Sequence, residues 1–180
     1  MVEVRGLLIS TVGSFLIVYK EKLKEIDDLL YKDIGKHWNE LDPNQWYDIK
    51  HYNNFLKAYS EASITHEKSW ITFGRNLFPA FWKAFGNPEG LKTTLEYIDW
   101  EAKYYNSNMR GKEFSERKFI NKEDGHVIMQ MDGKERNCLV SVGVYESLMA
   151  KSGAKGWAVK QTKCVKKGDP VCEFEVTWQK

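Results

Sequence analysis

The C-terminal end of the chain constrains the fold most, because it combines two strand-like segments with a tight turn. Trp157–Val165 and Val171–Trp178 are rich in β-branched and aromatic residues, and Lys166–Asp169 between them contains the glycine typical of a turn. This pattern predicts an antiparallel hairpin. Such a hairpin brings together Cys164 and Cys172, which lie on its two arms.

Upstream of this hairpin, apolar residues recur first at helical and then at strand spacing. We predict a strand over Val2–Val12, then a helix capped by Ser14. Further elements are predicted as helices over Ile26–Trp38, Trp46–Tyr59, Ile64–Phe85 with a kink or break near Leu77 caused by Pro79, Glu89–Tyr105 and Cys138–Lys151, and as strands over Phe114–Asn121 and His126–Met131. The order predicts a single α+β domain over residues 1–180, with N-terminal helices packed on a C-terminal antiparallel sheet and one helix inserted in the β-rich part.

One apolar run, Leu7–Tyr19, decides whether the chain is a membrane protein. The run is too short to cross a bilayer, which takes about 20 apolar residues. The charged sequence KEKLKE follows it, without a small-residue cleavage site, so we expect neither a signal peptide nor a membrane span. The net charge of +2 gives no attraction to nucleic acid. We therefore expect a cytoplasmic protein.

The chain has three cysteines, an odd number that argues against a complete disulfide framework. Asn137 is a suitable cap for a helix that begins at Cys138, where free backbone N–H groups favour a thiolate. Thiolates within reach of one another are common zinc ligands. Two alternatives stay open, namely buried reduced thiols and a Cys164–Cys172 disulfide formed on oxidation.

The C-terminal tract resembles the signature of a known family. The Trp-Ala-Val strand, Cys164, Lys-Lys-Gly-Asp, Cys172, Glu-Phe and Trp178 are similar to the end of 4-vinyl reductase (V4R) domains. The segments Gly74–Gly86 and Ser141–Val144 also resemble this family. The resemblance covers most of the chain, but only its C-terminal part is specific. It implies a fold similar to haem-NO-binding domains and to subunits of vesicle transport particles.

The resemblance also implies a metal site. In the phenol-sensing relatives, three cysteines and a glutamate hold zinc, and Cys138, Cys164 and Cys172 match those cysteines in order and spacing. The glutamate position is Gln161 here, and a neutral amide is a poor zinc ligand. The fourth position would then be taken by water, taken by Asp169, or vacant. The expected role of a bound zinc is structural, since it would pin the hairpin to the helix.

Aromatic residues are concentrated between Ile64 and Tyr105. The resemblance implies a mainly apolar pocket in this region for a hydrophobic, aromatic or tetrapyrrole-like ligand. The predicted ligand-binding residues are Trp70, Phe73, Phe78, Phe81, Trp82, Tyr97, Trp100 and Tyr104. Ordinary core packing is the alternative for any single ring.

Haem is disfavoured as the ligand by the same reading of the sequence. Haem-NO-binding relatives use a helix histidine and a Tyr-x-Ser-x-Arg motif, whereas Tyr105–Arg110 has one residue too many and precedes the strands. His66 is the histidine that we would test first as an axial ligand.

No catalytic constellation is present, because the chain lacks a phosphate loop, a nucleophile elbow and a dinucleotide fingerprint. We therefore expect no enzyme but a ligand-binding sensor domain with a small hydrophobic ligand. The resemblance implies a fused or separate signalling output domain as its partner, and a homodimer is expected. Two alternatives are a homodimeric assembly module and an accessory protein of tetrapyrrole metabolism.

Overall fold

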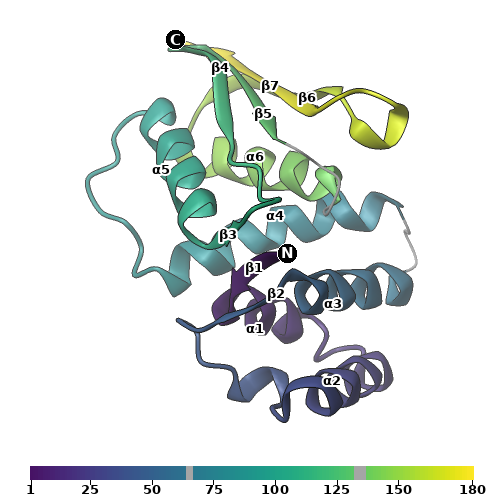
Figure 1. The fold of residues 1–180 in the computed structure, drawn as a ribbon. Coiled ribbons are helices and arrows are strands. Elements are labelled where there is room, and N and C mark those ends of the chain that lie inside the picture. The colour runs from purple at the N-terminus through teal and green to yellow at the C-terminus, as the bar shows by residue number, and fades with distance from the viewer. Residues whose placement is uncertain (64–66, 132–136) are drawn as a thin grey trace. The chain divides into compact units, whose positions relative to one another are not determined.

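The computed structural model describes residues 1–63, 67–131 and 137–180 (Figure 1). The chain forms two compact units. The first unit comprises Met1–Ser69 and Asn108–Phe114, and the second comprises Trp70–Ser107 and Ser115–Lys180. Each unit combines helices with an antiparallel sheet, so the predicted α+β class is confirmed.

The first unit contains a three-stranded sheet in the order β2-β1-β3. Its strands are β1 (Val2–Arg5), β2 (Trp46–Asp48) and β3 (Met109–Gly111). Its helices are α1 (Gly6–Phe15), α2 (Lys20–Ile34), the short 3-10 helix η1 (Trp38–Glu40) and α3 (Ile49–Ala62). Strand β3 joins the sheet through pairs such as Val4 with Met109, so a distant segment of the chain completes the unit.

The N-terminal prediction was wrong in two respects. Only Val2–Arg5 is a strand, and Gly6–Phe15 is a helix that ends where the predicted helix was to begin. A short, mainly apolar run shows no clear period in the sequence, so it does not distinguish strand from helix. Gly6 is the first residue of α1, and any larger residue there would collide through its Cβ with the carbonyl oxygen of Asp42.

The helical stripes of α2 and α3 were predicted correctly, apart from their ends. Helix α2 ends at Gly35, whose φ of 71° suits glycine. Asp48 caps α3 by accepting a hydrogen bond from the backbone N–H of Lys50, so Trp46 lies in a strand rather than in the predicted helix.

The second unit contains a four-stranded antiparallel sheet in the order β4-β5-β7-β6. Its elements are α4 (Glu67–Ala84, whose first three residues are counted with the first unit), α5 (Thr94–Ser107), β4 (Lys118–Glu123), β5 (His126–Met131), α6 (Cys138–Ser152), β6 (Lys155–Lys163), the 3-10 helix η2 (Val165–Lys167) and β7 (Cys172–Gln179). Helix α6 contacts β6 and β7 and lies along one face of this sheet (Figure 1). The buried face carries Val127, Met129, Phe174 and Val176.

The predicted hairpin and inserted helix are confirmed. Strand β6 pairs antiparallel with β7, and Asn137 caps α6 by accepting a hydrogen bond from the backbone N–H of Leu139. Of the two outcomes predicted near Leu77, a kink or a break, the break is wrong, because α4 continues through Pro79. Phe78 and Trp82 are buried on either side of Pro79, and their packing outweighs the one hydrogen bond that proline removes.

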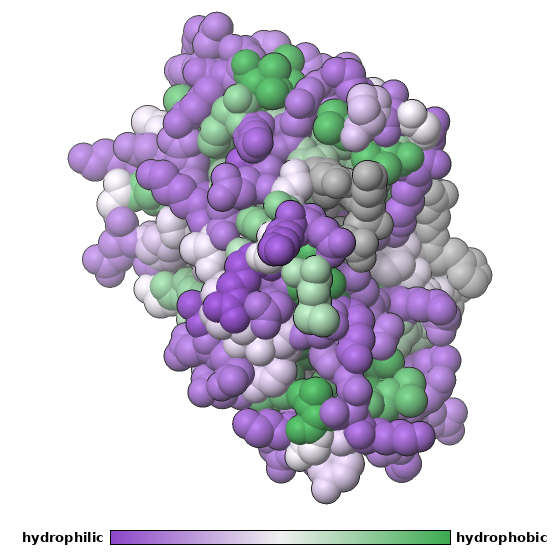
Figure 2. Space-filling view, viewed as in Figure 1, coloured by the Kyte–Doolittle hydropathy of each residue, from purple (hydrophilic) through white to green (hydrophobic). Residues whose placement is uncertain are grey.

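The visible surface in Figure 2 is mainly hydrophilic, with small apolar areas scattered across it. The large apolar side chains that are exposed include Ile17, Val18, Leu29, Tyr31 and Ile120. None of the helices in the described ranges combines the length and the apolar character that a membrane crossing requires.

Candidate metal and ligand sites

The three cysteines converge on one point inside the second unit. Cys138 is the first residue of α6, Cys164 follows β6, and Cys172 is the first residue of β7. All three are buried, and their Sγ atoms lie within 4.8 Å of one another, with Cys138 and Cys164 3.5 Å apart. We call these three residues the cysteine cluster. Three elements therefore present soft donor atoms to a single position, as metal sites require.

The turn between β6 and β7 directs backbone N–H groups at two of these sulfurs. The N–H groups of Lys166 and Lys167 donate to Cys164, and that of Val165 donates to Cys172. Hydrogen bonds of this kind stabilise a thiolate over a thiol. The turn itself is fixed by Asp169, whose carboxylate accepts a hydrogen bond from the N–H of Cys164 at 2.7 Å.

The three thiols differ in acidity because burial and hydrogen bonding balance differently at each sulfur. Burial raises the pKa of Cys138 to about 12, against a hydrogen bond from Gln161 that lowers it. Burial also raises the pKa of Cys172. At Cys164 the hydrogen bonds from Cys138, Lys166 and Lys167 outweigh burial, so its pKa is lowered. A cation bound here would favour the thiolate form of all three groups.

Two side chains were considered for the fourth ligand position. Gln161 reaches the cluster, because its amide is hydrogen-bonded to Cys138, and its Nε2 also donates to the carbonyl of Lys163 at 3.2 Å. The Asp169 carboxylate is instead engaged with the backbone of its own turn. The group beside the sulfurs is therefore a neutral amide rather than a carboxylate.

Six of the eight predicted ligand-binding residues come together between α4 and α5, and Phe85 joins them. We call the resulting set the aromatic cluster: Phe78, Phe81, Trp82, Phe85, Tyr97, Trp100 and Tyr104. Trp82 stacks on Tyr97 with ring centroids 5.2 Å apart, and Trp100 stacks on Tyr104 at 5.3 Å. The other two predicted residues, Trp70 and Phe73, lie about two turns earlier on α4.

The rings of the aromatic cluster contact one another. Phe85 and Tyr104 have centroids 3.9 Å apart, and the indoles of Trp82 and Trp100 meet edge to face at 4.9 Å. Such pairs are stabilising beyond the area that they bury. A flat ligand would therefore enter this cluster by separating rings that already pack together.

A buried polar network behind the aromatic cluster was missed by the sequence analysis. Arg117, which precedes β4, forms an ion pair with Glu101 on α5 and donates to Tyr145 on α6 at 2.8 Å and to Ser141 at 3.2 Å. Tyr145 donates to Glu101 at 3.0 Å. The ring of Tyr105 lies 4.0 Å from the Arg117 guanidinium. This network fastens α5 and α6 to the start of β4.

The spacing of residues in the sequence could have singled out Arg117. Ser115-Glu116-Arg117 has the spacing of the last three positions of the Tyr-x-Ser-x-Arg motif, with Glu113 at the tyrosine position. Arg110, the arginine singled out instead, lies on β3 and forms an ion pair with Glu3 at 2.7 Å. It also lies over the ring of Trp46 at 4.4 Å.

Each of the three described histidines faces a carboxylate. His37 lies 2.8 Å from Asp27, and His126 lies 2.9 Å from Glu175. His51 is buried and lies 3.2 Å from Asp33. His66 lies outside the described residues.

Comparison with known proteins identifies the fold. The sequence matches no protein-family profile and no curated protein. Solved structures of H-NOX proteins match over nearly their whole length. The H-NOX protein from S. oneidensis in the Fe(II)NO ligation state has a TM-score of 0.70, 9% identity, and coverage of 98% of this chain and 99% of that chain.

Two further H-NOX structures agree with the first. A mutant of the T. tengcongensis H-NOX has a TM-score of 0.67, 13% identity and 98% coverage of both chains. An Fe(II) unliganded mutant H-NOX from K. algicida has a TM-score of 0.63, 10% identity, and coverage of 98% of this chain and 97% of that chain. At these identities the likeness shows the fold alone, which is the haem-NO-binding fold that the V4R resemblance implied.

The expectation that disfavoured haem is corrected by this comparison. The matching structures include H-NOX proteins in Fe(II) states and one in which haem distortion was probed. Haem is thus a cofactor of solved proteins with this fold. The mismatch at Tyr105–Arg110 concerns one motif at one position, and it does not exclude haem for the rest of the chain.

Proposed function

We propose that this chain is a small-molecule-binding sensor domain of the 4-vinyl reductase type. The observation that carries the proposal is the aromatic cluster, which gathers seven rings from two adjacent helices of the second unit. A mainly apolar site with stacked rings suits a flat hydrophobic, aromatic or tetrapyrrole ligand. Tyr97 and Tyr104 add hydroxyl groups that could orient such a ligand. The proposal assigns no catalytic role to these residues.

Haem belongs among the tetrapyrroles to be tested, because solved proteins of this fold carry it. In the described part of the second unit the histidine is His126, which is bound to Glu175 on the sheet, so the described residues do not fit a histidine-ligated haem beside the aromatic cluster. Tyrosine and cysteine also ligate haem iron in proteins, and the absorption spectrum after addition of hemin reports the ligation state directly.

Ligand binding is tested on the purified protein with a panel of probes that includes 1-naphthol, phenol and hemin. We expect a one-to-one complex in native mass spectrometry and quenching of tryptophan fluorescence, because Trp82 and Trp100 lie within the aromatic cluster. If no probe is retained and the fluorescence is unchanged at millimolar concentrations of the two phenols and at micromolar hemin, the proposed binding function is wrong.

We further propose that the cysteine cluster holds zinc in a structural site. Three converging sulfurs and the N–H groups directed at Cys164 and Cys172 support this proposal. Water would complete the tetrahedron, since Gln161 supplies an amide where the relatives have a carboxylate. The bound ion would join the first residue of α6 to both arms of the β6–β7 hairpin.

The variant Gln161→Glu tests the fourth position. A carboxylate beside the three sulfurs should tighten zinc binding about tenfold, an effect within the range of changes around metal ligands. Competition with a chromophoric chelator measures the affinity, and Gln179→Glu, an exposed change at the end of β7, is the control. An unchanged affinity for Gln161→Glu would show that the side chain at position 161 does not reach the ion.

Three further expectations complete the proposal. We propose that residues 1–180 act as one functional domain, that the domain is a homodimer in the cytoplasm, and that ligand binding is passed to a fused or separate output domain. Light scattering on the purified chain tests the dimer. A mass of 21.1 kDa at all concentrations would contradict it.

A further inference from the structure

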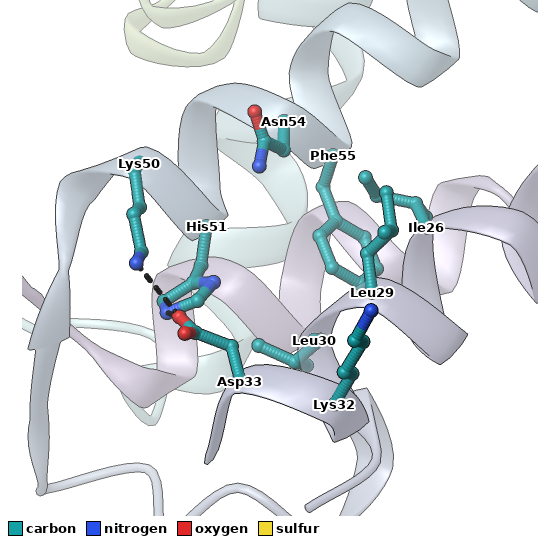
Figure 3. A pocket seen from close by; sticks show the side chains of 9 residues that line it. All are labelled: Ile26, Leu29, Leu30, Lys32, Asp33, Lys50, His51, Asn54 and Phe55. Atoms are coloured by element: carbon teal, nitrogen blue, oxygen red, sulfur yellow. Dashed lines mark ion pairs between the residues drawn. The ribbon is translucent and has the colours of Figure 1, made fainter.

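A groove between α2 and α3 in the first unit contains a pocket of about 380 Å³ (Figure 3). This volume is in the range of small-molecule sites. The pocket is lined by Ile26, Leu29, Leu30, Lys32, Asp33, Lys50, His51, Asn54 and Phe55. None of these residues belongs to the cysteine cluster or to the aromatic cluster.

One side of this pocket is apolar. Leu30 and Phe55 form a buried floor, with 2% and 0% of their surface exposed. Leu29 forms a wall of the pocket, and 54% of its surface is exposed although its side chain is apolar. An apolar ligand that covered Leu29 would remove this surface from water, which is favourable in proportion to the area buried.

The charged residues of the pocket carry a net positive charge, with Lys50, His51 and Asp33 together on one side and Lys32 beside Leu29 (Figure 3). The Asp33 carboxylate lies 2.7 Å from Lys50 Nζ and 3.2 Å from His51 Nε2. Burial lowers the pKa of His51, which favours its neutral form, so Lys50 and Asp33 cancel in charge. Within the described ranges Lys32 has no ion-pair partner, and it leaves one uncompensated cation at the pocket.

The groove continues beyond the first pocket. A second hollow of about 180 Å³ shares Ile26, Leu29 and Asn54 with the first and extends along the two helices past Ala58 to Glu61. The combined space is therefore elongated, with the apolar residues along its middle. Its shape suits a chain rather than a compact ring system.

We propose that the α2–α3 groove binds a medium-chain monocarboxylic acid from solution. The carboxylate pairs with Lys32, and the hydrocarbon chain lies against Leu29, Ile26 and Phe55. A cation beside a continuous apolar wall forms the complement of such a molecule (Figure 3). This site is independent of the proposed function of the second unit.

Titration of the ¹⁵N-labelled full chain with sodium octanoate tests the proposal by amide NMR. We expect saturable shifts at residues of α2 and α3, and little change at α4 and α5. Affinity should rise up to about fourfold for each added CH₂ from butanoate to octanoate, the gain expected for a buried methylene. Octan-1-ol, which lacks the charge, should bind several-fold more weakly.

Two variants with matched controls sharpen this test. Lys32→Met should weaken octanoate binding about fivefold, as expected for loss of one partly exposed ion pair. Lys24→Met on the same helix, remote from the pocket lining, should leave it unchanged. Leu29→Ala should weaken binding by a similar factor through lost apolar contact, whereas Ile17→Ala, at another exposed apolar residue, should not.

Three outcomes would overturn the inference. Shifts confined to α4 and α5 would place the fatty acid elsewhere. Equal affinity for octanoate and octan-1-ol, with no loss in Lys32→Met, would show that the charge is not recognised. Absence of saturable shifts at millimolar octanoate would show that the groove does not bind such acids.

Discussion

The cysteine cluster and the aromatic cluster are both located in the second unit, but they are built in opposite ways. The cysteine cluster brings three sulfurs from separate elements to one point, and backbone N–H groups support two of them. The aromatic cluster takes its rings from two adjacent helices, and those rings pack against one another. The first arrangement leaves a coordination position between the donors, whereas the second fills its own space.

This difference separates preformed sites from sites that must open. An ion can occupy the position between the sulfurs with small movements of the protein. Little of its binding free energy is therefore lost to rearrangement of the protein. A flat ligand must first separate stacked rings, each pair of which is stabilising by about 1 kcal/mol. Metal binding should therefore be tight and hard to alter by distant mutations, whereas ligand binding should depend on how firmly α4 and α5 are held.

The largest expected effect is the loss of zinc in Cys172→Ser. Structural zinc sites bind with about 10–16 kcal/mol, so removal of one of three sulfurs should weaken binding roughly a thousandfold. Chelator competition measures this change. Met131→Leu, which alters the sulfur-containing neighbour in the same buried core without removing a thiol, should retain the affinity. Equal zinc affinity in Cys172→Ser and the parent chain would remove the metal site from the proposal.

The next effect concerns the network that holds α5. Glu101→Gln leaves the buried charge of Arg117 without its carboxylate, and breaking a buried pair costs about 3–5 kcal/mol. Urea denaturation should show this loss of stability, and near-ultraviolet circular dichroism should show weaker ordering of the aromatic cluster. Glu116→Gln, at an exposed neighbour of Arg117, is the control. If Glu101→Gln is as stable as the control, the network does not fasten α5.

Gly143→Ala tests how α4 is held, with a smaller effect. A Cβ at Gly143 would collide with the carbonyl oxygen of Ile71, and one at Gly74 would collide with that of Val140, so the two helices cross at these glycines. Forcing them apart should cost about 1–3 kcal/mol in the free energy of unfolding. Zinc affinity should change little. A stabilised Gly143→Ala protein would contradict the close crossing, because alanine otherwise favours a helix.

The smallest effect is expected from a single ring. Trp100→Phe keeps an aromatic residue but loses part of the stack on Tyr104, so affinity for 1-naphthol should fall about threefold to tenfold. Fluorescence titration measures this change, and Trp157→Phe on β6 should have no effect. A larger loss in Trp157→Phe than in Trp100→Phe would place the ligand outside the aromatic cluster.

Short-range patterns predicted the C-terminal part of this fold well. The alternation of Val171–Trp178, the glycine at Gly168 and the cap at Asn137 are signals contained within a few residues, and each was confirmed. The convergence of the cysteines then follows from the hairpin and the helix that precedes it. By contrast, Leu7–Val12 is mainly apolar without a clear period, and the choice between strand and helix there depends on contacts with distant residues, such as the approach of Gly6 to Asp42.

Contacts between residues far apart in the chain could not be predicted from the sequence pattern. Strand β3 has three residues and exists because Met109 pairs with Val4, far away in the chain. The Arg117 network joins residues that are 16 to 44 positions apart, and nothing in the local composition around Arg117 predicts burial. The aromatic segments were recognised, but spacing along two helices does not reveal that the rings meet each other rather than a void.

Helix α6 has a consequence for the regulation of this protein. Its first eight residues include Cys138, then Ser141 and Tyr145 of the arginine network, and Gly143 at the crossing with α4. If zinc orders the start of α6, it also favours one placement of α4 and α5, the two helices that contribute rings to the aromatic cluster. Thermodynamic linkage then requires reciprocity: any factor by which zinc tightens ligand binding is the factor by which the ligand tightens zinc. The response of this chain to its ligand would then vary with the free zinc of its surroundings.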